Sequence, residues 1–135
     1  MATSTQRSGG LATESLGGLH WVGIVLAAVS GAIHLFLGVD GVTGSQYFSF
    51  ELGVAFLLAG LGFLGAVALV LLDIRRRAVY AVGIPFTAVQ IVIWYYSNFA
   101  TTDSSFPGDV GTFGAIDKIA QVLLIVVLIA LLRGE

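Results

Sequence analysis

Hydrophobic and polar positions divide the chain into four long apolar segments separated by short polar stretches. Each segment comes close to the ~20 residues that a helix needs to cross a hydrocarbon core about 30 Å thick. The apolar segments cover residues 19–39, 52–72, 78–99 and 113–132. This pattern predicts an all-α, polytopic membrane protein with four transmembrane helices in an up-down bundle.

The fourth segment is the least regular because it opens with a polar turn that contains Asp117, Lys118 and Gln121. The apolar run that follows this turn is too short to cross a membrane alone. We therefore expect the polar turn to belong to the same helix. Residues 19–135 then form one four-helix membrane domain.

The stretch before the first apolar segment has a different composition. Residues 1–18 are rich in Ser, Thr and Gly and show no hydrophobic periodicity, so we expect a flexible cytoplasmic tail. Arg7 is the only basic residue before the first segment, and the apolar run of that segment is longer than the core of a secretory signal. We interpret that segment as a helix of the mature protein.

Composition supports a membrane location and excludes several kinds of site. Hydrophobic residues make up 57% of the chain and charged residues 10%, against about 25% charged in soluble domains. The chain has no cysteine, which excludes disulfides, thiolate metal sites and iron–sulfur clusters. His20 and His34 lie roughly 21 Å apart along one helix, so they cannot ligate one haem within a chain. We expect no metal and no cofactor, and no basic surface for nucleic acid.

Charges in the loops predict the orientation. Arg75, Arg76 and Arg77 follow the second segment, whereas the third loop carries Asp103 and Asp109 and no base. Cytoplasmic loops retain positive charge, so the arginines are topology determinants that place their loop inside. The prediction is a multi-pass protein of the cell membrane with both termini cytoplasmic.

Small and aromatic residues indicate how the helices pack and where they meet the membrane boundary. Helices in lipid associate through close packing at small side chains. We also expect Tyr80 at the inner boundary, and Pro85 to kink the third helix, with Thr87 available to bond a freed carbonyl. The predicted small-residue faces contain Gly23, Ala27 and Gly31 in the first segment and Ala55, Ala59, Gly62 and Ala66 in the second.

Polar side chains gather in the outer half of three predicted spans. His34 lies roughly 7 to 8 Å below the outer boundary, with Ser30 one turn away on the same face. Polar positions on the third and fourth segments recur at helical spacing, so each set shares one face. We predict an outward-facing polar pocket, with the ring of His34 facing the third and fourth helices. The candidate pocket residues are Ser30, His34, Gln90, Trp94, Asn98, Asp117 and Gln121, with Tyr95 or Tyr96 at the mouth and Glu51 as a further member.

A purely structural interpretation accounts for the same residues. Interhelical hydrogen bonds between them, each contributing roughly 0.6 kcal/mol, fix the order of the helices. Glu51 and Asp117 lie near predicted helix N-termini, where the helix dipole favours acids. Lys118 is expected to extend its ammonium outward to the interface.

Two classes of function therefore stay open. One is a structural or accessory subunit in the lipid bilayer that packs with itself, as a homo-oligomer, or with a larger membrane complex. The alternative is a small-ligand or proton-linked binding or transport protein that uses His34, since histidine titrates near neutral pH, with Asp117 as its partner. An enzyme is not expected, because no nucleophile with a matching base is present.

Several strings in the chain also resemble a known family. The strings "LHWVGI", "IHLFLGV", "GVAFLLAGLGFLGA", "LVLLDIRRR", "GIPFTAVQIVIWY" and "DKIAQVLLIVVL" are similar to an uncharacterised haloarchaeal family of small four-helix integral membrane proteins with no assigned function. The resemblance covers about residues 19–132. It implies a membrane location and four spans, and it supplies no catalytic or binding residues.

Overall fold

A computed structural model describes residues 12–134 and leaves residues 1–11 and 135 outside the description. The described chain forms the helices α1 (Gly18–Val42), α2 (Phe50–Leu71), α3 (Arg76–Tyr95) and α4 (Thr112–Gly134). A single turn, η2 (Thr13–Ser15), precedes α1, and the π-helical turn η3 (Tyr96–Ala100) extends α3. Each long helix, α3 together with η3, is long and apolar enough to cross a membrane. The prediction of an all-α protein with four spans is confirmed for the described residues.

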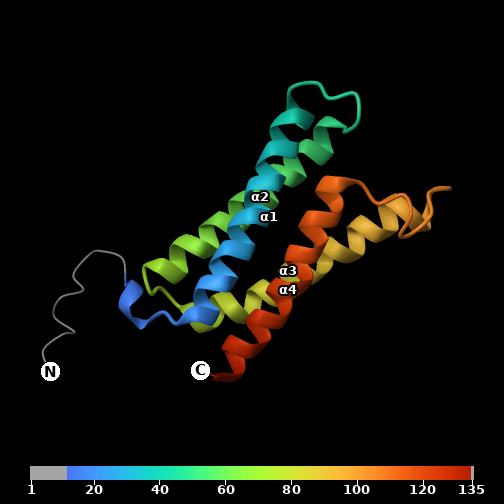
Figure 1. The fold of residues 1–135 in the computed structure, drawn as a ribbon. Helices are drawn as coiled ribbons and strands as arrows, with labels where there is room; N and C mark the ends of the chain where they lie inside the picture. The colour runs from blue at the N-terminus through green and yellow to red at the C-terminus, as the bar shows by residue number, and fades with distance from the viewer. Residues whose placement is uncertain (1–11, 135) are drawn as a thin grey trace, which may run out of the picture.

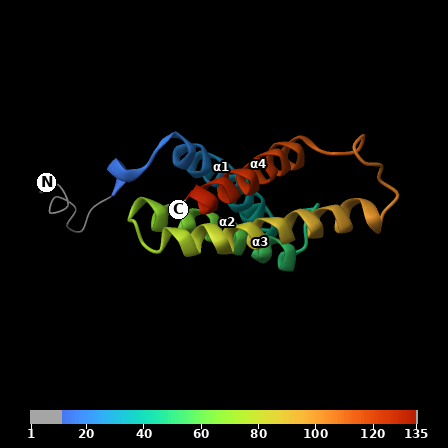
Figure 2. The same ribbon diagram turned by 90° about the horizontal axis from the view of Figure 1, so that it is seen from below.

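The helices form two antiparallel hairpins. The hairpin α1/α2 packs against the hairpin α3/α4 mainly through α1 and α4, whereas α2 and α3 make few contacts. Figure 1 shows the hairpins close together where α4 finishes and separated at their tips, and Figure 2 shows α1 beside α4. We call the end with residues 72–77 the arginine end, and the end with loops 43–49 and 101–111 the loop end.

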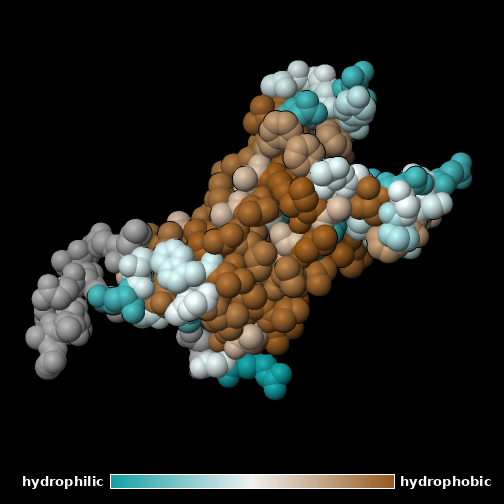
Figure 3. All heavy atoms as spheres, viewed as in Figure 1, coloured by the Kyte–Doolittle hydropathy of each residue, from teal (hydrophilic) through white to brown (hydrophobic). Residues whose placement is uncertain are grey.

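The outer surface of the bundle is apolar. Figure 3 shows a hydrophobic band over the middle of the molecule, with hydrophilic residues at its ends. Phe36, Leu58, Val92 and Ile119 are each more than half exposed on this band. Side chains of this kind suit the hydrocarbon of a bilayer.

Glycines bring α1 and α2 into backbone contact. A Cβ added to Gly41 would lie 2.6 Å from the Cα of Gly53, and one added to Gly60 would lie 2.9 Å from the carbonyl oxygen of Gly31. The predicted face of the second segment contributes little to this contact, because Ala55 and Gly62 are exposed. Gly53 and Gly60 form the contacting face of α2 instead.

Two side chains of the third span are buried inside the bundle. Tyr80 is 1% exposed and packs with Leu124 and Leu128 of α4, one turn after the start of α3, and its place at the inner boundary stays a prediction. Thr87 is fully buried, and no hydrogen-bond partner lies within reach of its hydroxyl among residues 12–134. The proposed bond from Thr87 to a freed carbonyl is therefore not made.

Residues 12–17 differ from the expected flexible tail, because Arg76 docks them against the arginine end. The Arg76 guanidinium donates to the Ala12 carbonyl at 2.7 Å, to Ser15 Oγ at 2.6 Å and to the Val70 carbonyl at 2.8 Å. The Ala12 amide donates to the Leu71 carbonyl at 2.7 Å. The remainder of the predicted tail, residues 1–11, lies outside the described residues.

Candidate functional site

A buried group of polar side chains joins α1 to α4. Ser30 Oγ on α1 donates to Asp117 Oδ1 on α4 at 2.5 Å. His34 Nδ1, one turn further along α1, donates to the Ser30 carbonyl at 2.8 Å and lies 3.6 Å from Asp117 Oδ1. Since a carbonyl can only accept, this bond places a proton on His34 Nδ1. The Asp117 carboxylate thus accepts a hydrogen bond from Ser30, and the His34 ring lies beside it without a hydrogen bond to it.

Lys118 neutralises this carboxylate. Its ammonium lies 2.9 Å from Asp117 Oδ2 and donates to Gln121 Oε1 at 2.7 Å. The same nitrogen lies 5.7 Å from the centroid of the Trp94 ring on α3, within reach of a cation–π contact. The expectation that Lys118 extends outward is therefore wrong. A buried carboxylate without a cation is costly, which accounts for the inward position of the ammonium.

The group continues to α3 through two glutamines. Gln121 Nε2 lies 3.3 Å from Ser30 Oγ and 3.1 Å from Gln90 Oε1, and it donates to both. Gln90 Nε2 donates to the Phe86 carbonyl of its own helix at 2.9 Å. Hydrogen bonds thereby connect α1, α4 and α3. We call Ser30, His34, Gln90, Asp117, Lys118 and Gln121 the polar network.

Four members of the polar network are closed to solvent. Ser30 and Gln121 are 0% exposed, Asp117 is 4% exposed and His34 is 5% exposed. The predicted outward-facing pocket is therefore wrong in its form: Ser30, His34, Asp117 and Gln121 bond within the bundle and line no opening, whereas Trp94, Tyr95 and Tyr96 line an open groove beside them. Asp117 does not cap the N-terminus of α4, since it lies five residues beyond Thr112 and bonds to Ser30.

The His34 ring faces α4, as expected, and α2, where α3 was expected. On one side it approaches Asp117, and on the other it packs against Phe56 at 5.7 Å and Phe63 at 5.8 Å between ring centroids. Neither phenylalanine was among the residues predicted for the site. Their spacing of seven residues on one helix face is the signal that could have paired them with a single partner.

Five predicted residues lie outside the polar network. Asn98 is exposed and donates to the Trp94 carbonyl of its own helical stretch at 2.8 Å. Trp94 meets the network only through Lys118. Glu51 is exposed in the first turn of α2, where Ser49 caps the helix by accepting from the Leu52 amide. The exposed residues Tyr95 and Tyr96 line an open groove on α3 and α4, and Trp94 and Lys118 line the same groove, so it reaches the edge of the polar network.

The arginines at the other end make specific contacts. Arg76 holds residues 12–17, and it also lies 3.3 Å from Asp73 Oδ1. Arg77 Nη1 donates to the Leu132 carbonyl at 3.0 Å, so it caps the last turn of α4. The sequence did not predict these contacts, because the excess of positive charge in cytoplasmic loops already accounts for a cluster of arginines beside a span.

Within residues 12–134, no three His, Asp or Glu side chains come close enough together to hold an ion. His34 and Asp117 would supply only two ligands, and the oxygens of the Asp117 carboxylate already interact with Ser30 and Lys118.

The apolar spans and the buried polar network together define a multi-pass membrane protein built as a helix bundle. A family model matches residues 5–132, and the chain belongs to that family, a family of unknown function (DUF7475). Comparison with curated proteins and with solved structures finds no match. The expected membership of an uncharacterised family is confirmed.

Proposed function

We propose that the protein is a non-catalytic structural or accessory subunit that acts through its helix faces in the membrane. The polar network carries this proposal, because its charged and amide groups are bonded to one another, including the Lys118 ammonium at the edge of the groove. Such a network fixes the relative position of α1, α3 and α4. A rigid apolar outer surface is then available to another membrane helix.

The short loops support the same proposal. Residues 43–49 and 101–111 connect the helices at the loop end, and the turn at the arginine end is shorter still. The described chain thus offers little surface outside a bilayer for binding a soluble partner. A second copy of this chain or a larger membrane complex is the partner that fits.

The source and orientation belong to the same proposal. We propose that the chain resides in the cell membrane of a haloarchaeon, with the arginine end and both termini in the cytoplasm. The run of Arg75, Arg76 and Arg77, against Asp103 and Asp109 at the loop end, supports this orientation.

A proton-linked binding or transport protein is the second candidate. It is favoured by the distance of 3.6 Å between His34 Nδ1 and Asp117 Oδ1 inside the spans, where ionisable groups often have a function. In this candidate His34 gains and loses the proton, and Asp117 stabilises the charged ring.

Native mass spectrometry of the detergent-purified protein tests both candidates. The first predicts a second copy or a partner subunit at fixed stoichiometry, lost in Asp117→Asn and kept in Asp40→Asn, an exposed residue of α1. Normal assembly of Asp117→Asn and His34→Ala with loss of a bound small molecule would favour the second candidate. A wild-type chain that is always alone would contradict the first.

A further inference from the structure

An apolar cavity lies inside the bundle, separate from the polar network and towards the arginine end. Its volume is about 60 Å³, and residues from α1, α2, α3 and α4 line it. A cavity of about 10–15 Å³ holds one water, so this cavity has room for a small group of atoms. Small residues create the space, namely Gly23, Ala27, Gly62, Ala66 and Gly83.

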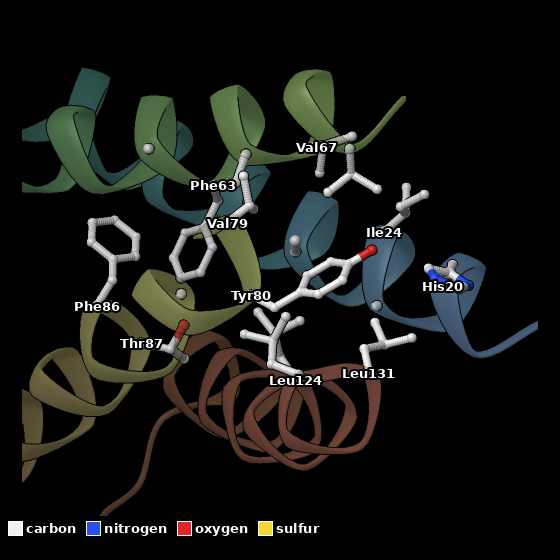
Figure 4. A pocket seen from close by; sticks show the side chains of 17 residues that line it. His20, Ile24, Phe63, Val67, Val79, Tyr80, Phe86, Thr87, Leu124 and Leu131 are labelled. Atoms are coloured by element: carbon white, nitrogen blue, oxygen red, sulfur yellow. The ribbon is translucent and has the colours of Figure 1, made fainter. Parts of the chain in front are cut away.

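Thr87 supplies a polar group inside this apolar space. The side chain is 0% exposed and lines the cavity, and Figure 4 shows its hydroxyl oxygen pointing toward the cavity between Phe63 and Phe86. No hydrogen-bond partner reaches this hydroxyl in the described part of the chain. A buried hydroxyl without a partner is unfavourable, and an acceptor atom in the cavity would satisfy it.

The cavity is partly open, and α2 and α3 make the fewest contacts of the neighbouring helix pairs. The seam between α2 and α3 is therefore the route to the lipid that the packing favours. Val67 and Val70 of α2 lie on one side of this seam, and Val79 and Phe86 of α3 lie on the other. A molecule dissolved in the hydrocarbon can therefore enter without crossing a polar surface.

The depth of Thr87 restricts the ligand. Thr87 lies eleven residues after Arg76, which is roughly 16 Å along the helix axis and close to the middle of the span. Ester and phosphate groups of ordinary lipids stay near the boundaries, about 15 Å away from the centre of the core. The acceptor must belong to a molecule that places it within the hydrocarbon.

We propose that this cavity binds the end of an apolar hydrocarbon that carries one hydrogen-bond acceptor oxygen, a carbonyl or an ether. The Thr87 hydroxyl donates to that oxygen, the small residues enclose the chain end, and the remaining hydrocarbon leaves through the seam between α2 and α3. This inference does not depend on the accessory role, since the cavity shares no residue with the polar network.

Binding of a straight-chain methyl ketone, compared with the alkane of equal length, tests the proposal. The full-length protein in micelles is titrated with each probe, and the methyl signals of Leu128 and Val79, both cavity-lining, report binding by NMR. We expect the ketone to bind the wild type more tightly than the alkane. Thr87→Val keeps the shape and removes the donor, so it weakens ketone binding about tenfold, the equivalent of one hydrogen bond, and leaves alkane binding unchanged.

A matched pair of substitutions on α2 locates the site. Ala66→Phe fills the cavity and abolishes binding of both probes, whereas Ala68→Phe adds the same ring on the exposed face and changes neither. Equal binding of ketone and alkane, unaffected by Thr87→Val, would overturn the proposal in favour of a simple lipid-tail socket. Absence of binding to the wild type, or binding that survives Ala66→Phe, would overturn it as well.

Discussion

Asp117 and Lys118 place opposite charges 2.9 Å apart inside the span of α4. Both side chains are nearly buried, with 6% and 12% of their surface exposed. Breaking such a pair leaves one charge without compensation, which costs far more than the pair itself contributes. The Lys118 ammonium is therefore what permits a carboxylate at this depth.

Replacing Lys118 tests this dependence. Lys118→Met retains the apolar stem and removes the charge, so Asp117 is left buried without its cation. We expect the free energy of unfolding in micelles to fall by about 3 kcal/mol. Arg133→Met is the control, because Arg133 is an exposed cation at the end of the same helix and its loss should change stability little. Equal stability of the two variants would contradict the role assigned to Lys118.

Most members of the polar network could be recognised in the sequence, but their partners could not. Polar positions at helical spacing in apolar segments identified Ser30, His34, Gln90, Asp117 and Gln121. Whether such residues line an opening or bond to one another depends on the rotation of each helix about its own axis. The sequence pattern does not define this rotation to within a few tens of degrees. Lys118 was misplaced because a flexible side chain can reach outward to water or inward to a carboxylate with the same backbone.

The contact between α1 and α2 shows a second limit of sequence patterns. In a soluble protein the apolar face of a helix points inward, whereas in a bilayer the lipid-facing surface is apolar as well. Small residues on α2 form several stripes, and hydrophobicity does not distinguish the stripe that faces α1. Backbone proximity selects Gly53 and Gly60, and leaves Gly62 and Gly65 exposed.

Two glycine substitutions on α2 should therefore have opposite effects. A Cβ on Gly53 would lie 2.7 Å from the Val42 backbone nitrogen and 2.9 Å from the Gly41 Cα, so Gly53→Ala forces the helices apart. We expect a loss of about 1–3 kcal/mol in the free energy of unfolding. Gly65 has no atom within 4 Å of an added Cβ, so Gly65→Ala should raise stability by up to about 1 kcal/mol through helix propensity. A destabilisation of similar size in both variants would contradict the close approach of α1 and α2.

The contact between η2 and the start of α3 depends on the guanidinium of Arg76. Arg76→Met removes the donors to Ala12 and Ser15, and hydrogen exchange at the Ala12 amide should accelerate because its bond to Leu71 is no longer supported. Arg75→Met is the matched control, since Arg75 is an exposed neighbour in the same turn. Unchanged exchange in Arg76→Met would show that residues 12–17 dock without this arginine.

For the molecule as a whole, the number of spans and their up-down order followed from the sequence, whereas the separation of the two hairpins at the loop end did not. The length of an apolar segment must match the thickness of the bilayer, and this length is read directly from the hydropathy of the sequence. The packing of one hairpin on the other depends on side-chain contacts between segments far apart in the chain, such as Phe36 with Phe113. A single sequence carries no periodic signal for such pairs.

Cysteine labelling tests the proposed orientation. The native chain has no cysteine, so a single introduced thiol reports one position. We expect Ser104→Cys at the loop end to react with a membrane-impermeant maleimide in intact cells, and Arg75→Cys at the arginine end to react only after lysis. The opposite pattern would contradict the assignment of the arginine end to the cytoplasm.

The link between the two hairpins is tested most directly by a double-mutant cycle across Ser30 and Asp117. The free energy of unfolding in micelles is measured for the wild type, Ser30→Ala, Asp117→Asn and the double variant. A bond of 2.5 Å between α1 and α4 predicts a coupling energy of about 1 kcal/mol, within the range found for interhelical hydrogen bonds in membranes. A coupling energy of zero would contradict the polar network as the connection that holds the hairpins together.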